Sequence, residues 1–139
     1  MDSVTVYFDG GSGPKGASCA AVVLSAGELL IERSLVLETG VTSNVAEYNG
    51  LLLGVFSSFS YAPSHLEIVG DSKLLIEQLN GRWEVRAQHL KYLHRSVLVA
   101  LAQMKCSWSA RWVSREENKR ADSLCRKALS DLLEVGSTE

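Results

Sequence analysis

The stretch from Val4 to Gly13 (VTVYFDGGSG) constrains the fold most, because an apolar run ends in a carboxylate and then in residues with small side chains. β-Branched and aromatic residues favour a strand, and glycine permits a tight turn or the close approach of a ligand to the backbone. We therefore expect a strand that delivers Asp9 to an open edge of a sheet. Taken alone, the Asp9-Gly10 pair is more typical of a hairpin turn, so a functional site here depends on residues elsewhere.

Hydrophobic patterning predicts the other elements of a single α/β domain over residues 1–139. Short turns join the first three strands into an antiparallel meander, and a strand–helix–strand crossover adds parallel strands. We expect a five-stranded mixed sheet flanked by helices. The further strands are expected at residues 17–24, 28–37, 65–70 and 107–113, and the helices at residues 43–59, 73–79, 88–104 and after residue 118, with a flexible tail at 134–139.

The patterns within the helices indicate which faces pack. Gly50 and Gly54 leave the face that follows Glu47 nearly bare, which predicts close packing of this helix against another element. The two later amphipathic helices each carry one apolar stripe, consisting of Leu90, Leu93, Val97, Leu98 and Leu101 in the first, and Ala121, Leu124, Cys125, Ala128 and Leu132 in the second.

Composition narrows the class of protein. With 46% apolar and 22% charged residues, no signal pattern and no spanning apolar run, we expect a cytoplasmic globular protein that does not bind membranes. Cys19, Cys106 and Cys125 are odd in number and far apart, so we expect small buried residues, not disulfides or zinc ligands. The net charge is −2, but most of the 14 lysines and arginines lie within residues 73–127. This distribution indicates either a basic side of the molecule or ordinary solvated helix faces.

Four carboxylates lie at junctions between the expected elements, at Asp9, Glu47, Asp71 and Asp122. If strand 65–70 pairs in parallel with the first strand, Asp9 and Asp71 emerge about 4.8 Å apart at neighbouring carboxyl ends. Each acid also has a structural explanation, because Asp9 can belong to a hairpin turn, Asp71 can cap a helix, and the other two suit helix dipoles. Crowded carboxylates repel one another unless divalent cations lie between them, and oxygen ligands select Mg²⁺ or Mn²⁺.

The order of elements and four short motifs resemble the ribonuclease H fold from Val4 to about Leu129. The motifs are Asp-Gly-Gly-Ser at 9–12, Asn44-x-x-Glu47, Gly70-Asp71-Ser72 and Asn118-x-x-Ala121-Asp122. Residues 113–118 (VSREEN), followed by Ala-Asp, are similar to the type 1 enzymes of archaeal and some bacterial lineages. The resemblance implies that the four acids are catalytic residues and ligands of two Mg²⁺ ions, for which Mn²⁺ can substitute.

The same resemblance implies a monomeric endonuclease that hydrolyses the RNA strand of RNA/DNA hybrids by a two-metal-ion mechanism. The products would carry 5′-phosphate and 3′-hydroxyl ends. Residues near the first two motifs, together with Gln78, would contact the RNA strand, and the basic segment from Arg82 to Arg95 would hold the DNA strand. The implied substrate-binding residues are Gly10, Gly11, Ser12, Asn44, Gln78, Trp83, Lys91, Arg95, Arg115 and Asn118.

The chain departs from the family pattern in two places. Many members have a histidine in the loop before the last acid, whereas residues 114–119 contain none. We expect Arg115 to take this place by holding a phosphate, unless it only pairs with Glu116 or Glu117 at the surface. The basic protrusion of some members is also absent, which predicts weaker substrate binding.

Two other functions are compatible with these residues. A different nuclease of this fold, acting on DNA junctions or single strands, would use the same metal chemistry, although Asn44 and the motif at Asn118 disfavour it. A non-catalytic nucleic-acid-binding copy of the fold is disfavoured because all four acids are present.

Overall fold

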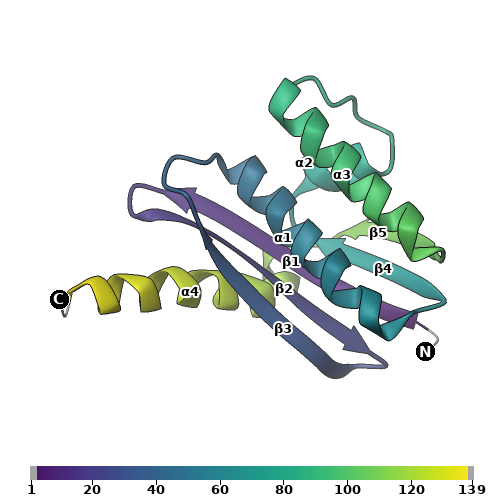
Figure 1. The fold of residues 1–139 in the computed structure, drawn as a ribbon, viewed down its shortest axis with the longest axis horizontal. Coiled ribbons are helices and arrows are strands. Elements are labelled where there is room, and N and C mark those ends of the chain that lie inside the picture. The colour runs from purple at the N-terminus through teal and green to yellow at the C-terminus, as the bar shows by residue number, and fades with distance from the viewer. Residues whose placement is uncertain (1–2, 138–139) are drawn as a thin grey trace.

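A five-stranded mixed sheet of order β3-β2-β1-β4-β5 forms the centre of the computed structural model, which describes residues 3–137 (Figure 1). β1 (Ser3–Gly13), β2 (Gly16–Ser25) and β3 (Glu28–Leu37) form the antiparallel meander. β4 (His65–Gly70) pairs in parallel with β1, and β5 (Ser107–Trp112) pairs in parallel with β4. The predicted mixed sheet is therefore confirmed.

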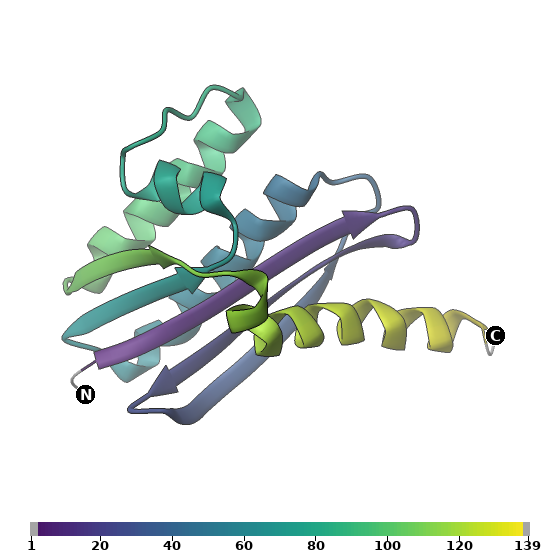
Figure 2. The ribbon, with the colours of Figure 1, turned by 180° about the vertical axis from the view of Figure 1, so that it is seen from behind.

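The helices cover both faces of this sheet. α1 (Ser43–Ser58) and α3 (Gln88–Met104) pack on one face, and α2 (Lys73–Leu79) follows the end of β4. α4 (Lys119–Ser137) crosses the opposite face and then extends beyond the sheet (Figure 2). Most of the tail expected at 134–139 is thus helical, residues 138 and 139 lie outside the described part, and the flexibility of the tail stays a prediction.

Glycines set the distance between α1 and β1. A Cβ atom added to Gly50 would overlap the carbonyl oxygen of Asp9, and one added to Gly54 would overlap the Cγ1 atom of Val6. A Cβ atom at Gly10 would in turn overlap the backbone of Ala46. The expected close packing of the bare helix face is confirmed, and it places the first turns of α1 directly beside the end of β1.

Some local features differ from the expectations. The hairpin turn that was the alternative at Asp9-Gly10 does not form, because β1 continues to Gly13 and stays paired with β2. Leu98 and Leu132 belong to the predicted apolar stripes, but they are 37% and 50% exposed, because α3 packs against α1 and α2 on one side only and α4 extends beyond the sheet (Figure 2). Cys106 is only partly buried, whereas Cys19 and Cys125 are buried as expected. Within residues 3–137, no helix combines the length and apolarity needed to cross a bilayer.

Candidate active site

Four elements bring one carboxylate each to a cleft of about 400 Å³ at one edge of the sheet. The parallel register pairs Phe8 with Gly70, so Asp9 and Asp71 follow directly from paired residues of neighbouring strands. Glu47 comes from α1 and Asp122 from the first turn of α4. The structure thus brings together all four acids that the sequence analysis selected. Besides them, the cleft is lined by Gly10, Gly11, Ser12, Ser18, Ser43, Arg115, Cys125 and Arg126.

Three of the acids form a tight cluster. Asp9, Glu47 and Asp71 each offer one carboxylate oxygen, and these three oxygens all lie within 4.8 Å of one another. Asp122 stands beside this cluster, where its carboxylate raises the pKa of Asp9. The Oδ1 atom of Asp122 also accepts a hydrogen bond from Nε of Arg126, at 3.2 Å. The fourth acid is therefore shared between the cluster and a neighbouring arginine.

Burial and mutual repulsion dominate the electrostatics of the cluster. Burial, followed by the nearby Asp71 carboxylate, raises the pKa of Asp9 to about 7. Burial also raises the pKa of Glu47 to about 7, although a hydrogen bond with Ser72 opposes the shift. Neither carboxyl is easily ionised near neutral pH in this arrangement. A cation between the carboxylates would favour their charged forms, which is typical of a metal site.

Hydroxyl side chains, and not the carboxylates of the cleft, cap the N-termini of α1 and α2. Ser72 caps α2, because its Oγ atom accepts a hydrogen bond from the Leu75 amide at 3.3 Å. Asp71 is therefore not the helix cap that the sequence left open as an explanation. Thr42 caps α1 in the same way, through the Val45 amide.

Arg115 reaches the cleft from the segment between β5 and α4, whereas Asn118 on the same segment does not line it. Nε of Arg115 lies 3.8 Å from Oδ2 of Asp71, and the arginine side chain is 77% exposed whereas that of Asp71 is 10% exposed. The alternative pairing of Arg115 with Glu116 or Glu117 is thus not what the structure contains. Asn118 is 1% exposed and donates from Nδ2 to the Phe8 carbonyl at 2.9 Å. It ties the start of α4 to β1, a structural role that its motif did not indicate.

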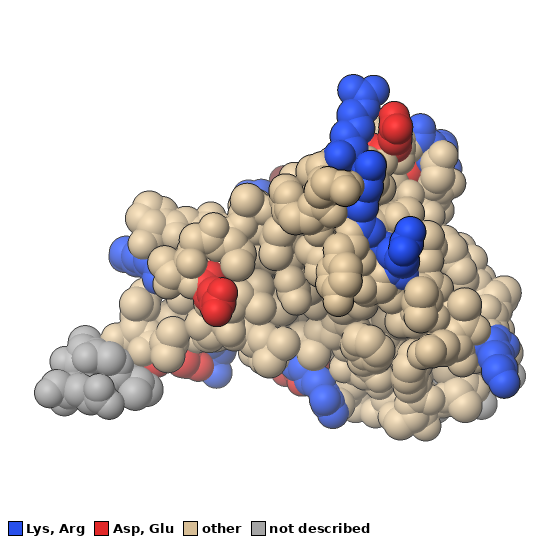
Figure 3. Space-filling view, turned by 45° about the horizontal axis from the view of Figure 1, so that its top comes forward, with Lys and Arg blue, Asp and Glu red and all other residues tan. Residues whose placement is uncertain are grey.

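A second hollow, which we call the α3 groove, is bordered by Gln78, Trp83, Lys91, His94 and Arg95. Trp83 is 44% exposed, and Lys91 and Arg95 are exposed on α3. Figure 3 shows lysine and arginine side chains over α3 and the loop before it, with acidic atoms beside them, and a basic side of the molecule stays a prediction. Gln78 is buried and accepts a hydrogen bond from the Tyr48 hydroxyl at 2.6 Å.

Two of the other residues expected to contact a substrate, Asn44 and Asn118, line neither hollow. The backbone at Gly10, Gly11 and Ser12 lines the acid cleft, whereas Asn44 is partly buried in the first turn of α1 and does not line it. That these residues, Gln78 or Asn118 contact a substrate stays a prediction.

Four residues that line the cleft were not selected from the sequence, namely Ser18, Ser43, Cys125 and Arg126. Arg126 stands four residues after Asp122 on α4, and this spacing of opposite charges is a signal that could have identified it. Cys125 and Ser18 are joined by a hydrogen bond from the Ser18 hydroxyl to the Cys125 carbonyl at 2.7 Å. No sequence pattern links them, because 107 residues separate the two.

Comparison with known proteins agrees with this geometry. Residues 7–128 match the family described as reverse transcriptase-like. A bifunctional protein of Mycobacterium tuberculosis is 33% identical over 129 residues, which are 91% of this chain and 35% of that protein. Ribonuclease HI of Halobacterium salinarum is 32% identical over 134 residues, which are 92% of this chain and 65% of that protein. The chain therefore spans about a third to two thirds of these curated relatives.

Two solved structures extend the comparison to the whole fold. The N-terminal RNase H domain of the M. tuberculosis protein has a TM-score of 0.88 at 30% identity, covering 98% of this chain and 99% of that one. LC11-RNase H1, solved in complex with an RNA/DNA hybrid, has a TM-score of 0.88 at 25% identity, covering 94% and 99%. The family match over residues 7–128, the sheet order and the clustered acids lead to one conclusion: the chain belongs to the reverse transcriptase-like family and has the ribonuclease H fold.

Proposed function

We propose that this protein is a ribonuclease H, an endonuclease that hydrolyses the RNA strand of RNA/DNA hybrids and leaves 5′-phosphate and 3′-hydroxyl ends. The observation that carries the proposal is the convergence of Asp9, Glu47 and Asp71 within 4.8 Å, with Asp122 lining the same cleft. Purely structural acids at helix caps would have no reason to crowd together at a cost in repulsion. The related LC11 enzyme, solved with a hybrid, supports the choice of substrate.

The donor set in the cleft fits a hard divalent cation. It consists of carboxylate oxygens, two of which belong to groups with a raised pKa, and such ligands suit Mg²⁺ or Mn²⁺. We propose that Asp9, Glu47 and Asp71 hold one ion and that Asp9 and Asp122 hold a second. When bound, the ions supply an activated water and stabilise charge on the phosphate.

The residues around the acids would bind and orient the substrate. Gly11 has open space where a Cβ atom would lie, so a sugar–phosphate backbone can approach the main chain there. Contacts to 2′-hydroxyl groups at this point would distinguish RNA from DNA. Arg115, exposed beside Asp71, can hold a phosphate by paired hydrogen bonds but cannot release a proton near neutral pH.

The α3 groove would hold the DNA strand of the hybrid. Lys91 and Arg95 offer positive charge to phosphates, and Trp83 offers an exposed ring to a sugar or base. The missing basic protrusion leaves few further cations here, which is why we expect weak and salt-sensitive binding. We also propose that the protein acts as a monomer in the cytoplasm.

The test is a cleavage assay on end-labelled RNA/DNA, RNA/RNA and DNA/DNA duplexes, with and without Mg²⁺ and with Asp71→Asn as the inactive control. We expect cleavage of the RNA strand of the hybrid alone, dependent on the metal. Cleavage of DNA would instead indicate another nuclease of this fold. Binding of the hybrid without cleavage at any metal concentration would indicate a non-catalytic copy.

A further inference from the structure

Trp112, the last residue of β5, lies beside the acid cleft without being one of its lining residues. The parallel register places it next to Gly70, and its indole Nε1–H donates a hydrogen bond to the main-chain carbonyl of Asp71 at 3.1 Å. Trp112 is 45% exposed. A large aromatic residue this exposed contributes little to the core, so the hydrogen bond to Asp71 is its most specific contact.

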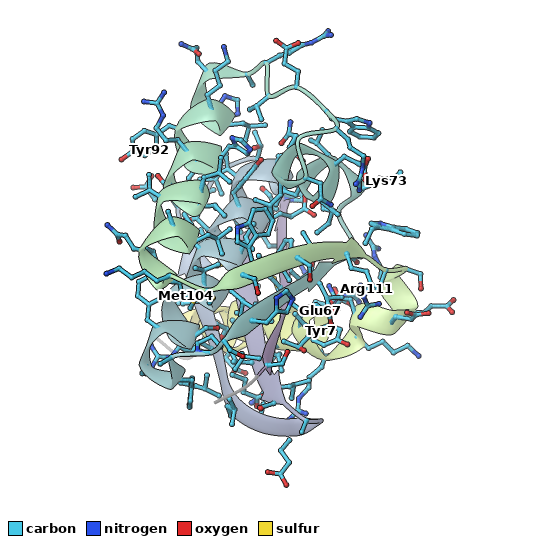
Figure 4. All side chains as sticks on the ribbon, turned by 90° about the vertical axis from the view of Figure 1, so that its right-hand side faces the viewer. Tyr7, Glu67, Lys73, Tyr92, Met104 and Arg111 are labelled. Atoms are coloured by element: carbon cyan, nitrogen blue, oxygen red, sulfur yellow. The ribbon has the colours of Figure 1, made fainter. Side chains whose placement is uncertain are left out.

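Lys73 also contacts the indole ring of Trp112. Its Nζ atom lies 5.5 Å from the centroid of the Trp112 ring, within the range of a cation–π contact. Lys73 is exposed and begins α2, two residues after Asp71. Figure 4 shows Lys73 and Arg111, the residue before Trp112, on the same side of the molecule. The ring therefore contacts the chain both at Asp71 and just after it.

These contacts brace the segment in which β4 turns into α2. The Val113 amide donates to the Gly70 carbonyl at 3.0 Å, and Trp112 continues this pairing by one residue through its side chain. Asp71 is thus held at its carbonyl by the end of β5 while its carboxylate joins the cluster. A shift of the Asp71 main chain would move the carboxylate relative to Asp9 and Glu47.

We propose that Trp112 is a positioning residue for the metal site, which acts by fixing the main chain of Asp71, and that Lys73 keeps the indole in place. The inference rests on the proposed metal-dependent function of the cleft. Groups that orient a metal ligand without touching the metal typically change affinity about 10-fold to 100-fold when removed. Because Trp112 acts through the main chain, we expect the lower end of this range.

The experiment compares Trp112→Phe, which keeps an aromatic ring but removes the N–H donor, with Trp108→Phe on the same strand. Trp108 packs against the core and serves as the matched control for loss of an indole. Calorimetric titration with Mn²⁺, without nucleic acid, gives the metal affinity, and thermal unfolding gives the stability. Cleavage of the hybrid is then measured as a function of Mn²⁺ concentration.

We expect Trp112→Phe to bind Mn²⁺ about 10-fold more weakly with little change in melting temperature, and its turnover to recover at high Mn²⁺. Lys73→Met should weaken Mn²⁺ binding by about threefold, because the indole loses its cation–π contact. Trp108→Phe should lower the melting temperature and leave the metal affinity unchanged.

Three results would overturn the inference. Wild-type Mn²⁺ affinity in Trp112→Phe would do so while leaving the proposed function intact, and so would an equal loss in Trp108→Phe. Failure of the wild-type protein to bind Mn²⁺ at all would overturn both this inference and the metal-dependent function. The two failures are thus distinguishable in a single titration series.

Discussion

The acid cleft and the α3 groove differ in how their side chains are held. In the cleft, carboxylates from four elements meet, Asp71 has a side chain only 10% exposed, and the contact between Gly50 and β1 leaves α1 no room to shift. In the α3 groove, Trp83, Lys91 and Arg95 are exposed, and both cations stand on one helix.

This difference separates two kinds of contribution to function. A group fixed by packing from several elements has no alternative position, so its loss cannot be compensated by a neighbour. Exposed cations on a helix contribute through charge, and each acts almost independently in a screened environment. We therefore expect large, salt-independent effects in the cleft and small, salt-dependent effects in the groove.

The largest effect is expected for Asp71→Asn. The substitution keeps the shape but removes a carboxylate from the cluster, so cleavage of the hybrid with Mg²⁺ should fall at least about 10³-fold while the fold is retained. Glu67→Gln, on the strand that precedes Asp71 and outside the cleft, is the control and should retain full activity. A folded Asp71→Asn protein with near-normal turnover would contradict the proposal that these acids hold the catalytic metal ions.

Arg115→Ala tests the exposed edge of the cleft. Since Arg115 is beside Asp71 but 77% exposed, we expect kcat to fall about 10-fold to 100-fold with Mn²⁺ affinity retained. Asp122→Asn should be more severe, because it removes a proposed metal ligand. Steady-state kinetics and metal titration of both variants test whether Asp122→Asn is the more severe change. Wild-type turnover in Arg115→Ala would show that this side chain has no part in catalysis.

The double variant Lys91→Ala, Arg95→Ala tests the α3 groove. If both side chains contact phosphate, the slope of log affinity against log salt should decrease in magnitude by up to about 2. Binding of the hybrid to a metal-free protein, measured by anisotropy at several salt concentrations, gives the slope. Lys127→Ala on α4 is the control variant, because it removes a cation outside the groove. An unchanged slope in the double variant would show that Lys91 and Arg95 do not contact phosphates of the hybrid.

The smallest effect concerns stability, measured without metal. The folded protein holds Asp9 and Glu47 at a pKa of about 7, above their ordinary values of 3.8 and 4.5, so between these limits it binds more protons than the unfolded chain. The free energy of unfolding must then fall as pH rises through this window. We expect Asp9→Asn to flatten the decline of melting temperature between about pH 4 and pH 7, and to raise that temperature at the upper end. An equally steep decline in the variant would contradict a crowded, buried cluster.

The order of elements followed from local patterns in the sequence. The apolar runs predicted β4 with the bounds found in the structure, and the helical spacing and stop signals did the same for α2 and α3. Placing Asp9 beside Asp71 required only the parallel pairing of β1 with β4, which a crossover helix makes the natural arrangement. The cluster of acids was predictable because each acid ends or begins an element whose position the topology determines.

Other features had no local signal. Whether Leu98 is buried depends on how far α3 is tilted across its neighbours, and the continuation of β1 past Asp9 depends on its pairing with β2. The hydrogen bonds from Asn118 to β1 and from Trp112 to Asp71 join residues that are far apart along the chain. Sequence patterns report the preferences of neighbouring residues, whereas these contacts depend on the distance and angle between packed elements. By itself, the sequence determined which residues could form the site, and only the tertiary structure decided which side chains hold those residues in place.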